Sequence, residues 1–235
     1  MATLLLVRHG RTSANVSGIL AGWTPGVSLD DTGRTQATHL AARLGDLPVT
    51  AVASSPLERC TQTAAALVAE RGLRVNVDDR LGECRYGDWT GRSVKELARE
   101  PLWKVVQAHP SAVVFPGAGG ESLRAVSARA VDVVRELDAR VSASHGPDAV
   151  WVAVSHADVI KAVLADALGL HLDEFQRIVV DPCSVSVVRY TPLRPFVSRV
   201  NDTGSLAGLV PPPRRRRKGR TRTSDAVVGG GAGSS

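Results

Sequence analysis

The sequence is short of cysteine and of long hydrophobic runs, and each shortage excludes a class of protein. Its 3 cysteines are an odd number without C-x-x-C spacing, so they predict neither a disulfide framework nor a zinc site. No segment approaches the roughly 18 consecutive apolar residues that a membrane span needs. No basic segment stands ahead of the first apolar run at 4–7, which argues against a signal peptide. We therefore expect a cytoplasmic protein with no membrane partner.

Acidic residues are scarce at one end of the chain, and this scarcity accounts for the net charge of +6. From Pro211 onward there are seven lysines and arginines against one acidic residue, Asp225, whereas residues 1–210 are formally neutral. Proline, glycine and serine are also common there, a composition that buries too little apolar surface to fold. We predict a folded domain over 1–205 and a disordered basic tail over 206–235. A nucleic-acid partner is not expected, because the folded part is neutral and no aromatic residues are interleaved with the cations; weak, salt-sensitive contact through the tail is the alternative.

Strand-like and helix-like patterns alternate before this tail, which predicts an α/β protein whose sheet is connected by crossover helices. The strand-like runs are 3–7, 50–54, 148–155 and 184–190. The helix-like segments are 31–44, 56–71, 123–141 and 157–168. The run at 148–155 is almost continuously apolar, as expected for a strand covered on both faces. A segment rich in glycine, tryptophan and proline, 81–120, is expected to lie over the sheet edge.

Three of the predicted strands end in residues suited to binding an anion. They are followed by R-H-G at 8–10, by S-S-P-L-E-R at 54–59 and by S-H at 155–156. Open α/β sheets bind ligands in the crevice beyond the carboxyl ends of their strands. The cationic and imidazole side chains that would meet there are Arg8, His9, Arg59 and His156. Arginine's fork matches phosphate oxygens, and an imidazole kept neutral by neighbouring cations is a nucleophile. The pattern therefore predicts a site for phosphoryl transfer.

Five blocks carry these residues. They are L-L-L-V-R-H-G-R-T-S-A-N (4–15), S-S-P-L-E-R-C-T-Q-T-A (54–64), L-G-E-C-R-Y-G-D-W-T-G (81–91), G-G-E-S (119–122) and V-S-H-A-D-V-I-K (154–161). In this order they resemble the motifs of the histidine phosphatase superfamily, in its phosphoglycerate mutase-like branch. The resemblance implies a three-layer αβα fold in which helices flank a mostly parallel central sheet.

The resemblance also implies a role for each residue of the crevice. His9 would be the nucleophile that becomes phosphorylated, and Glu83 the general acid that protonates the leaving oxygen and later activates water. The residues that would hold the transferring phosphoryl group are Arg8, Arg59, His156 and Asn15. Burial of Glu83 would raise its pKa and the nearby arginines would lower it, and the sequence leaves open which effect is larger. Because cationic side chains hold the phosphoryl group, neither a metal nor a cofactor is expected.

Contacts to the rest of the substrate are expected from the loop 18–30 and from the segment 83–120. The further candidates for substrate binding are Gly22, Tyr86 and Ala157. Ala157 stands where the family usually has glycine after its second catalytic histidine. Its methyl group is expected to narrow the pocket or to shift a backbone N–H contact.

The sequence favours a phosphatase over a mutase. Between Glu83 and His156 it has no Arg-Arg pair of the kind that binds the substrate carboxylate in phosphoglycerate mutases. We predict a metal-independent phosphomonoester hydrolase that acts through a phosphohistidine on small phosphorylated metabolites. One alternative is a phosphoglycerate mutase-type phosphomutase; the cations that could then bind a carboxylate are Arg85, Arg92, Lys95 and Lys104. The other is a non-catalytic module that binds a phosphorylated ligand. A homodimer is left open.

Overall fold

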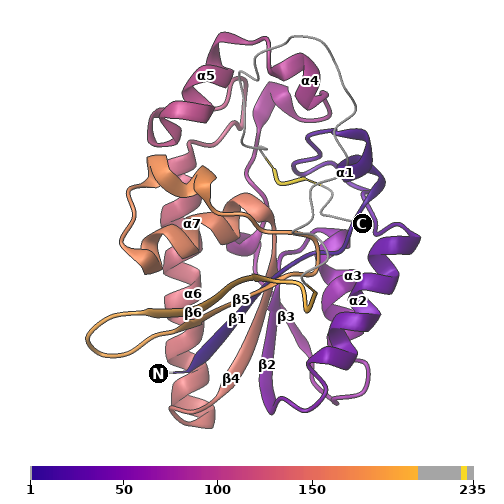
Figure 1. Cartoon of the computed structure of the whole chain (residues 1–235), viewed down its shortest axis with the longest axis vertical. Helices are drawn as coiled ribbons and strands as arrows, with labels where there is room; N and C mark the ends of the chain where they lie inside the picture. Colours follow the sequence, from indigo (N-terminus) through magenta and orange to yellow (C-terminus); the bar gives the residue numbers. More distant parts are fainter. Residues whose placement is uncertain (1, 206–228, 232–235) are drawn as a thin grey trace.

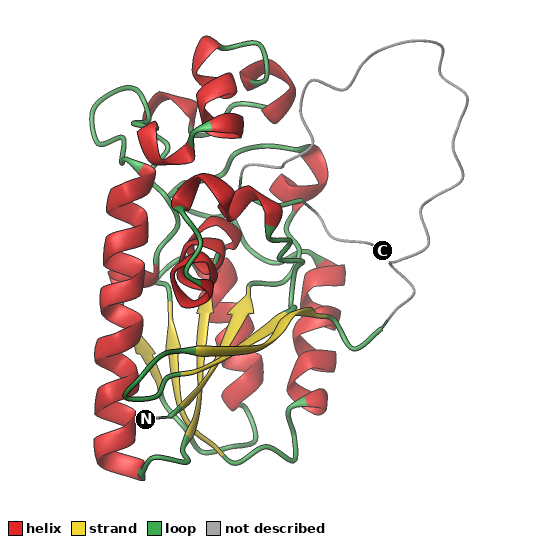
Figure 2. Ribbon diagram, turned by 60° about the vertical axis from the view of Figure 1, so that its left-hand side comes forward, coloured by secondary structure: helices red, strands yellow, loops and turns green. Residues whose placement is uncertain are grey.

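The computed structural model describes residues 2–205 and 229–231, which contain one sheet packed between two layers of helices (Figure 1; Figure 2). The strands described are β1 Thr3–Arg8, β2 Val49–Ser54, β3 Val75–Val77, β4 Val150–Ser155, β5 Val185–Arg189 and β6 Phe196–Asp202. Their order in the sheet is β3-β2-β4-β1-β5-β6. β1 to β4 run parallel, and β5 and β6 add an antiparallel edge. The predicted α/β fold with a mostly parallel sheet is confirmed.

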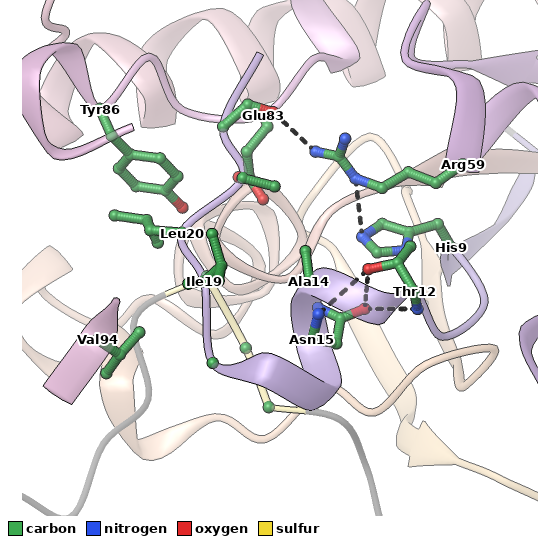
Figure 3. Close-up of a pocket in the computed structure, with 16 residues that line it drawn as sticks. His9, Thr12, Ala14, Asn15, Ile19, Leu20, Arg59, Glu83, Tyr86 and Val94 are labelled. Atoms are coloured by element: carbon green, nitrogen blue, oxygen red, sulfur yellow. Dashed lines mark hydrogen bonds between the residues drawn. The ribbon is translucent and has the colours of Figure 1, made fainter. Parts of the chain in front are cut away.

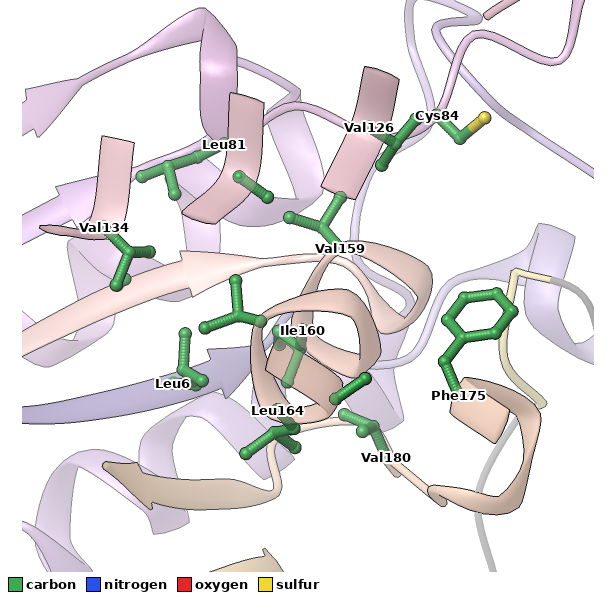
Figure 4. Close-up of a cluster of buried hydrophobic side chains, with 14 of the residues drawn as sticks. Leu6, Leu81, Cys84, Val126, Val134, Val159, Ile160, Leu164, Phe175 and Val180 are labelled. Carbon is green, nitrogen blue, oxygen red and sulfur yellow. The ribbon is translucent and has the colours of Figure 1, made fainter. Parts of the chain in front are cut away.

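Helices cover both faces of this sheet. Those described are α1 Ser13–Ser17, α2 Asp31–Arg43, α3 Glu58–Val68, α4 Val94–Leu97, α5 Pro101–Ala108, α6 Leu123–His145 and α7 Ala157–Leu168. Leu4 and Leu6 of β1 belong to the core cluster under α6 and α7, part of which Figure 4 shows. Leu5 and Val7 belong to the cluster under α2 and α3. Successive residues of a strand point to opposite faces, so a strand buried on both faces has to be continuously apolar.

The loop after β1 is fixed by close packing against the start of α2. The carboxylate of Asp30 caps α2 by accepting a hydrogen bond from Gly33 N at 2.7 Å. A Cβ at Gly10 would lie 2.6 Å from Gly33 O, and one at Gly33 would lie 2.0 Å from Arg11 O. Two glycines therefore let the backbone of α2 touch the backbone of the loop that carries His9.

Several element boundaries differ from the sequence prediction. The helix predicted from residue 56 begins at Glu58, and the one predicted to end at residue 141 continues to His145. The strands β3 and β6 were not predicted, because β3 has three residues and both are largely exposed, without the apolar runs of the central strands.

The predicted excursion 81–120 covers the carboxyl edge of the sheet, with α4 and α5 above the strand ends (Figure 1). Leu20 N donates to Arg92 O at 3.0 Å and Val94 N donates to Gly18 O at 2.8 Å, so the excursion is joined to the loop that follows α1. These two segments form one wall of the crevice.

The predicted tail 206–235 lies outside the described residues, apart from Gly229–Gly231. The proposed domain boundary near residue 205 therefore stays a prediction. Within the described part of the chain, no helix combines the length and the apolar composition that crossing a membrane requires.

Candidate active site

The crevice lies where β1, β4 and β2 end next to one another. His9 follows β1, and Arg59 lies in the first turn of α3 after β2 (Figure 3). His156 follows β4. Because these strands are parallel neighbours in the sheet, their carboxyl ends meet at one edge. The ring centroids of His9 and His156 are 5.2 Å apart in an edge-on arrangement. The fold thus brings together residues that are far apart in the sequence.

His9 is held as a neutral imidazole with the lone pair on one ring nitrogen, Nε2. Its Nδ1 lies 2.7 Å from the carbonyl oxygen of Gly10, which can only accept, so Nδ1 carries the proton. Its Nε2 therefore has a lone pair, and Arg59 Nε donates to it at 3.3 Å. Burial, followed by the charges of Arg59 and Arg8, lowers the pKa of His9 well below its usual value. The ring has the charge state and the tautomer of a nucleophile.

Glu83 is a buried carboxyl group beside this pair. Its Oε2 lies 3.7 Å from His156 Nδ1, and its Oε1 accepts a hydrogen bond from Cys84 N at 3.0 Å. Burial, followed by the charge of Asp158, raises the pKa of Glu83 to about 7, against the lowering effect of Arg59. Burial therefore outweighs the arginines, the balance that the sequence left open. A carboxyl group with this pKa can donate a proton near neutral pH and take one back.

Ser55, the residue that follows β2, positions the second histidine, His156. His156 Nε2 and Ser55 Oγ are 2.8 Å apart, and both side chains are fully buried. Burial, followed by Arg59 and His9, lowers the pKa of His156 well below its usual value. The thiol of Cys60 lies 3.4 Å from the same Nε2, but burial raises the pKa of Cys60 to about 12, so it stays a thiol and is not a competing nucleophile.

The two arginines offer donors to an anion. Arg8 is fully buried; its NH1 donates to Val180 O at 2.8 Å, while its Nε and NH2 have no hydrogen-bond partner among the described residues. Arg59 uses NH2 to donate to Gly22 O at 2.9 Å. Unpaired buried guanidinium donors are costly. A bound phosphoryl group would satisfy those of Arg8.

The predicted substrate-binding residues divide into two groups. Asn15, Gly22 and Tyr86 line the same pocket as His9, Arg59 and Glu83. Asn15 also forms a capping box with Thr12: its Oδ1 accepts from Thr12 N at 3.0 Å, and Thr12 Oγ1 accepts from Asn15 N at 3.2 Å. Its predicted phosphate contact stays a prediction. Arg8 and Ala157 belong to the second group, because Gly230 packs against both and covers them on the pocket side.

A family model described as the histidine phosphatase superfamily (branch 1) matches residues 4–203. This chain belongs to the histidine phosphatase superfamily.

Named relatives of this histidine phosphatase are phosphatases. Glucosyl-3-phosphoglycerate phosphatase of Mycobacterium tuberculosis (strain ATCC 25618 / H37Rv) is 35% identical over 170 residues, which are 71% of this chain and 75% of the relative. Phosphoserine phosphatase 1 of Hydrogenobacter thermophilus is 32% identical over 206 residues, 86% of this chain and 93% of the relative. A solved mycobacterial glucosyl-3-phosphoglycerate phosphatase in complex with VO3 has a TM-score of 0.75 at 29% identity, over 85% of this chain and 99% of that chain. The predicted class, a phosphomonoester hydrolase, is confirmed.

Two features of this histidine phosphatase escaped the sequence analysis. Asp158 lies buried behind Tyr86, although it stands in the quoted block V-S-H-A-D-V-I-K two residues after His156. Gly229–Gly231 line the pocket, although they lie in the segment predicted to be a tail. A buried acidic residue inside the motif was a usable signal for the first, whereas no local pattern indicated the second.

Proposed function

We propose that this phosphatase hydrolyses small phosphomonoesters in two steps, with a phosphohistidine on His9 as the intermediate. The observation that carries the proposal is the hydrogen bond that His9 Nδ1–H donates to Gly10 O, which leaves Nε2 as the reactive nitrogen next to Arg59. Phosphorylated metabolites are favoured as substrates by the names of the relatives: a glucosyl-3-phosphoglycerate phosphatase, a phosphoserine phosphatase and an adenosylcobalamin/alpha-ribazole phosphatase.

In the first step, His9 Nε2 attacks phosphorus while the bond to the leaving oxygen breaks. Glu83 donates its proton to that oxygen, so the alcohol departs neutral and Glu83 becomes a carboxylate. Arg8, Arg59 and His156 hold the three remaining phosphoryl oxygens, and the two arginines balance their charge. The transition state of phosphoryl transfer is loose, and positioning with cationic stabilisation supplies most of its catalysis.

In the second step, water replaces the histidine. The carboxylate of Glu83 takes one proton from the water, whose oxygen attacks phosphorus as the phosphorus–nitrogen bond breaks. His9 regains its lone pair, Glu83 is protonated again, and inorganic phosphate leaves. A pKa of about 7 suits Glu83 to both directions of proton transfer.

The mutase alternative receives less support from the pocket. Arg85 stacks on Trp23, with its Cζ 3.8 Å from the ring centroid, and Arg92 pairs with Glu100 at 2.7 Å. Among the described residues, the lining of the pocket includes neither of these arginines nor Lys95 or Lys104. None of these four cations of the described chain is therefore placed to hold a substrate carboxylate after phosphoryl transfer, which favours attack by water over return of the phosphoryl group.

The cellular setting is part of the same proposal. The thiols of Cys60, Cys84 and Cys183 are all free and buried, as is usual in a reducing compartment. We place the enzyme in the cytoplasm on this ground.

The proposed intermediate is tested by trapping it. Brief incubation with a ³²P-labelled substrate and quenching in alkali should leave alkali-stable, acid-labile label on the peptide that contains His9. His9→Ala should lose both the label and turnover, whereas His39→Ala, at an exposed position on α2, should keep both. Turnover near that of the wild type in His9→Ala would overturn the proposal.

A further inference from the structure

Asp158 is a buried carboxylate whose hydrogen bonds lead to the pocket. It is 1% exposed. Its Oδ2 accepts hydrogen bonds from Tyr86 Oη at 3.0 Å and from Gly229 N at 2.9 Å. Its Oδ1 has no hydrogen-bond partner among the described residues, and Lys161 Nζ lies 3.5 Å from it. Burying a carboxylate costs free energy unless hydrogen-bond donors surround it, so the N–H of Gly229 lowers the cost of burying Asp158.

This carboxylate lies behind Tyr86 and Gly229, which line the side of the pocket on which the alcohol part of a substrate would lie. Tyr86 and Gly229 line the pocket together with Glu83, and a Cβ at Gly229 would lie 3.4 Å from Tyr86 Oη. In-line transfer puts the leaving oxygen opposite His9 Nε2, next to the acid that protonates it. The Gly229 N–H therefore stands between Asp158 and the space that the leaving alcohol would enter.

We propose that Asp158, oriented by Tyr86, accepts a hydrogen bond from an N–H or O–H group on the alcohol part of the substrate. The proposal rests on the proposed function and narrows its substrate class to phosphomonoesters that carry such a donor near the ester oxygen. The Gly229 N–H demonstrates that a donor fits this position. An ammonium group gains most, because both partners of the hydrogen bond are then charged.

Three probes of equal length test the assignment: 2-aminoethyl phosphate, 2-hydroxyethyl phosphate and propyl phosphate. In the full-length wild type, kcat/KM should be at least about tenfold higher for 2-aminoethyl phosphate than for propyl phosphate, the gain of one charge-assisted hydrogen bond. Asp158→Asn should reduce that ratio to within about threefold, mainly through KM. The effect follows from loss of the charged acceptor.

The matched control is Asp166→Asn, the same substitution in the same helix, at a surface aspartate paired with Arg135. It should leave the ratio unchanged. A merely structural Asp158 would instead lower kcat/KM equally for all three probes, and that result would overturn the proposal.

Tyr86→Phe, which removes the hydroxyl that orients Asp158, should also lower the ratio of kcat/KM for 2-aminoethyl phosphate to that for propyl phosphate. This variant serves as the test if Asp158→Asn does not fold. Loss of the His9 label would count against the proposed function, whereas normal labelling with an unchanged ratio would count against Asp158 alone.

A second inference stands on the packing of Gly230. A Cβ at Gly230 would lie 2.5 Å from Ala157 Cβ and 2.8 Å from Arg8 Cζ. Gly229 and Gly230 both have φ of 72°, a conformation that side chains rarely adopt. Only glycine therefore fits against the phosphate-binding arginine. Figure 1 shows this short segment in yellow, over the carboxyl ends of the strands.

We infer that Gly229–Gly231 occupy the pocket in the substrate-free enzyme, with Gly229 beside Tyr86 and Gly230 against Arg8, and compete with substrate. Occupation of this kind multiplies KM by the reciprocal of the fraction of enzyme that is unblocked, and it leaves kcat unchanged. Gly230→Val in the full chain should displace the segment and lower KM for 2-aminoethyl phosphate at least about threefold.

Gly72→Val is the matched control, because Gly72 also has a positive φ, of 64°, lies outside the pocket lining, and would have nothing within 4 Å of an added Cβ. It should keep the wild-type KM. A KM that is unchanged or higher in Gly230→Val would overturn the inference, and in the second case the segment would be part of the substrate site.

Discussion

His156 Nδ1 lies 3.7 Å from Glu83 Oε2, and both side chains are buried. Burial and Asp158 raise the pKa of Glu83 to about 7, whereas burial, Arg59 and His9 lower the pKa of His156 well below its usual value. Because the two shifts have opposite signs, the proton of this pair resides on the carboxyl group at mildly acidic pH. The site therefore combines a protonated acid with a neutral imidazole, two environments that assign two roles.

The pH profile should follow from these shifts. Activity requires neutral His9, whose lowered pKa moves the acid limb well below the usual histidine range. It also requires protonated Glu83, so kcat/KM for an alkyl phosphate should fall as the pH passes about 7. The optimum should lie on the acidic side of neutrality. A profile of kcat/KM for 2-aminoethyl phosphate checks this, and an alkaline optimum would contradict it.

Glu83→Gln should affect poor leaving groups most. An alkyl alkoxide needs a proton to depart, and loss of a general acid costs about 10²–10⁴ in rate. p-Nitrophenyl phosphate should lose less in its phosphorylation step, because nitrophenolate departs without a proton. The measurement is single-turnover phosphorylation of the enzyme by both substrates, with Glu136→Gln, at the exposed partner of Arg80, as control. Equal losses with an unchanged alkaline limb would remove Glu83 from the role of acid.

Arg59→Met should lower kcat by about 10²–10³, the usual loss when one preorganised donor is removed. It should also move the acid limb to higher pH, because Arg59 contributes to the low pKa of His9. Arg135→Met, at a surface arginine paired with Asp166, should change neither. An activity loss without movement of the limb would mean that Arg59 does not act on the nucleophile.

Metal removal and mutase substrates separate the remaining alternatives. Activity should survive EDTA, because cationic side chains stabilise the phosphoryl oxygens. A strict requirement for a metal ion would contradict this expectation.

With 3-phosphoglycerate and catalytic 2,3-bisphosphoglycerate, release of phosphate should exceed isomerisation. Faster isomerisation than hydrolysis would move the enzyme to the mutase branch.

Gly33→Ala should destabilise the fold and the site together. The new Cβ would lie 2.0 Å from Arg11 O, so the backbone of α2 has to move away from the loop that carries His9. Overpacking of this kind costs about 1–3 kcal/mol of unfolding free energy. Urea unfolding measures the loss, and Thr38→Ala on the exposed face of α2 should stay within about 0.5 kcal/mol of the wild type. Unchanged stability in Gly33→Ala would show that the backbone of α2 can move away from Arg11 O without a loss of unfolding free energy.

The sequence by itself determined the central sheet and most of the crevice. Strands such as 148–155 are recognisable because burial on both faces demands continuous apolar residues. His9, Arg59 and His156 could be grouped because parallel strands place their carboxyl ends at one edge. The order of the five motif blocks added Glu83, which no periodicity would have joined to the others.

Tertiary structure alone decided the protonation states of Glu83 and His9 and the contacts that Asp158 makes at the pocket. Water exclusion around Glu83 fixes its pKa, and the Gly10 carbonyl fixes the tautomer of His9. Asp158 meets Tyr86 across 72 positions of the chain and Gly229 across 71. Desolvation and contacts between distant residues depend on the packed structure, and a local sequence pattern encodes neither.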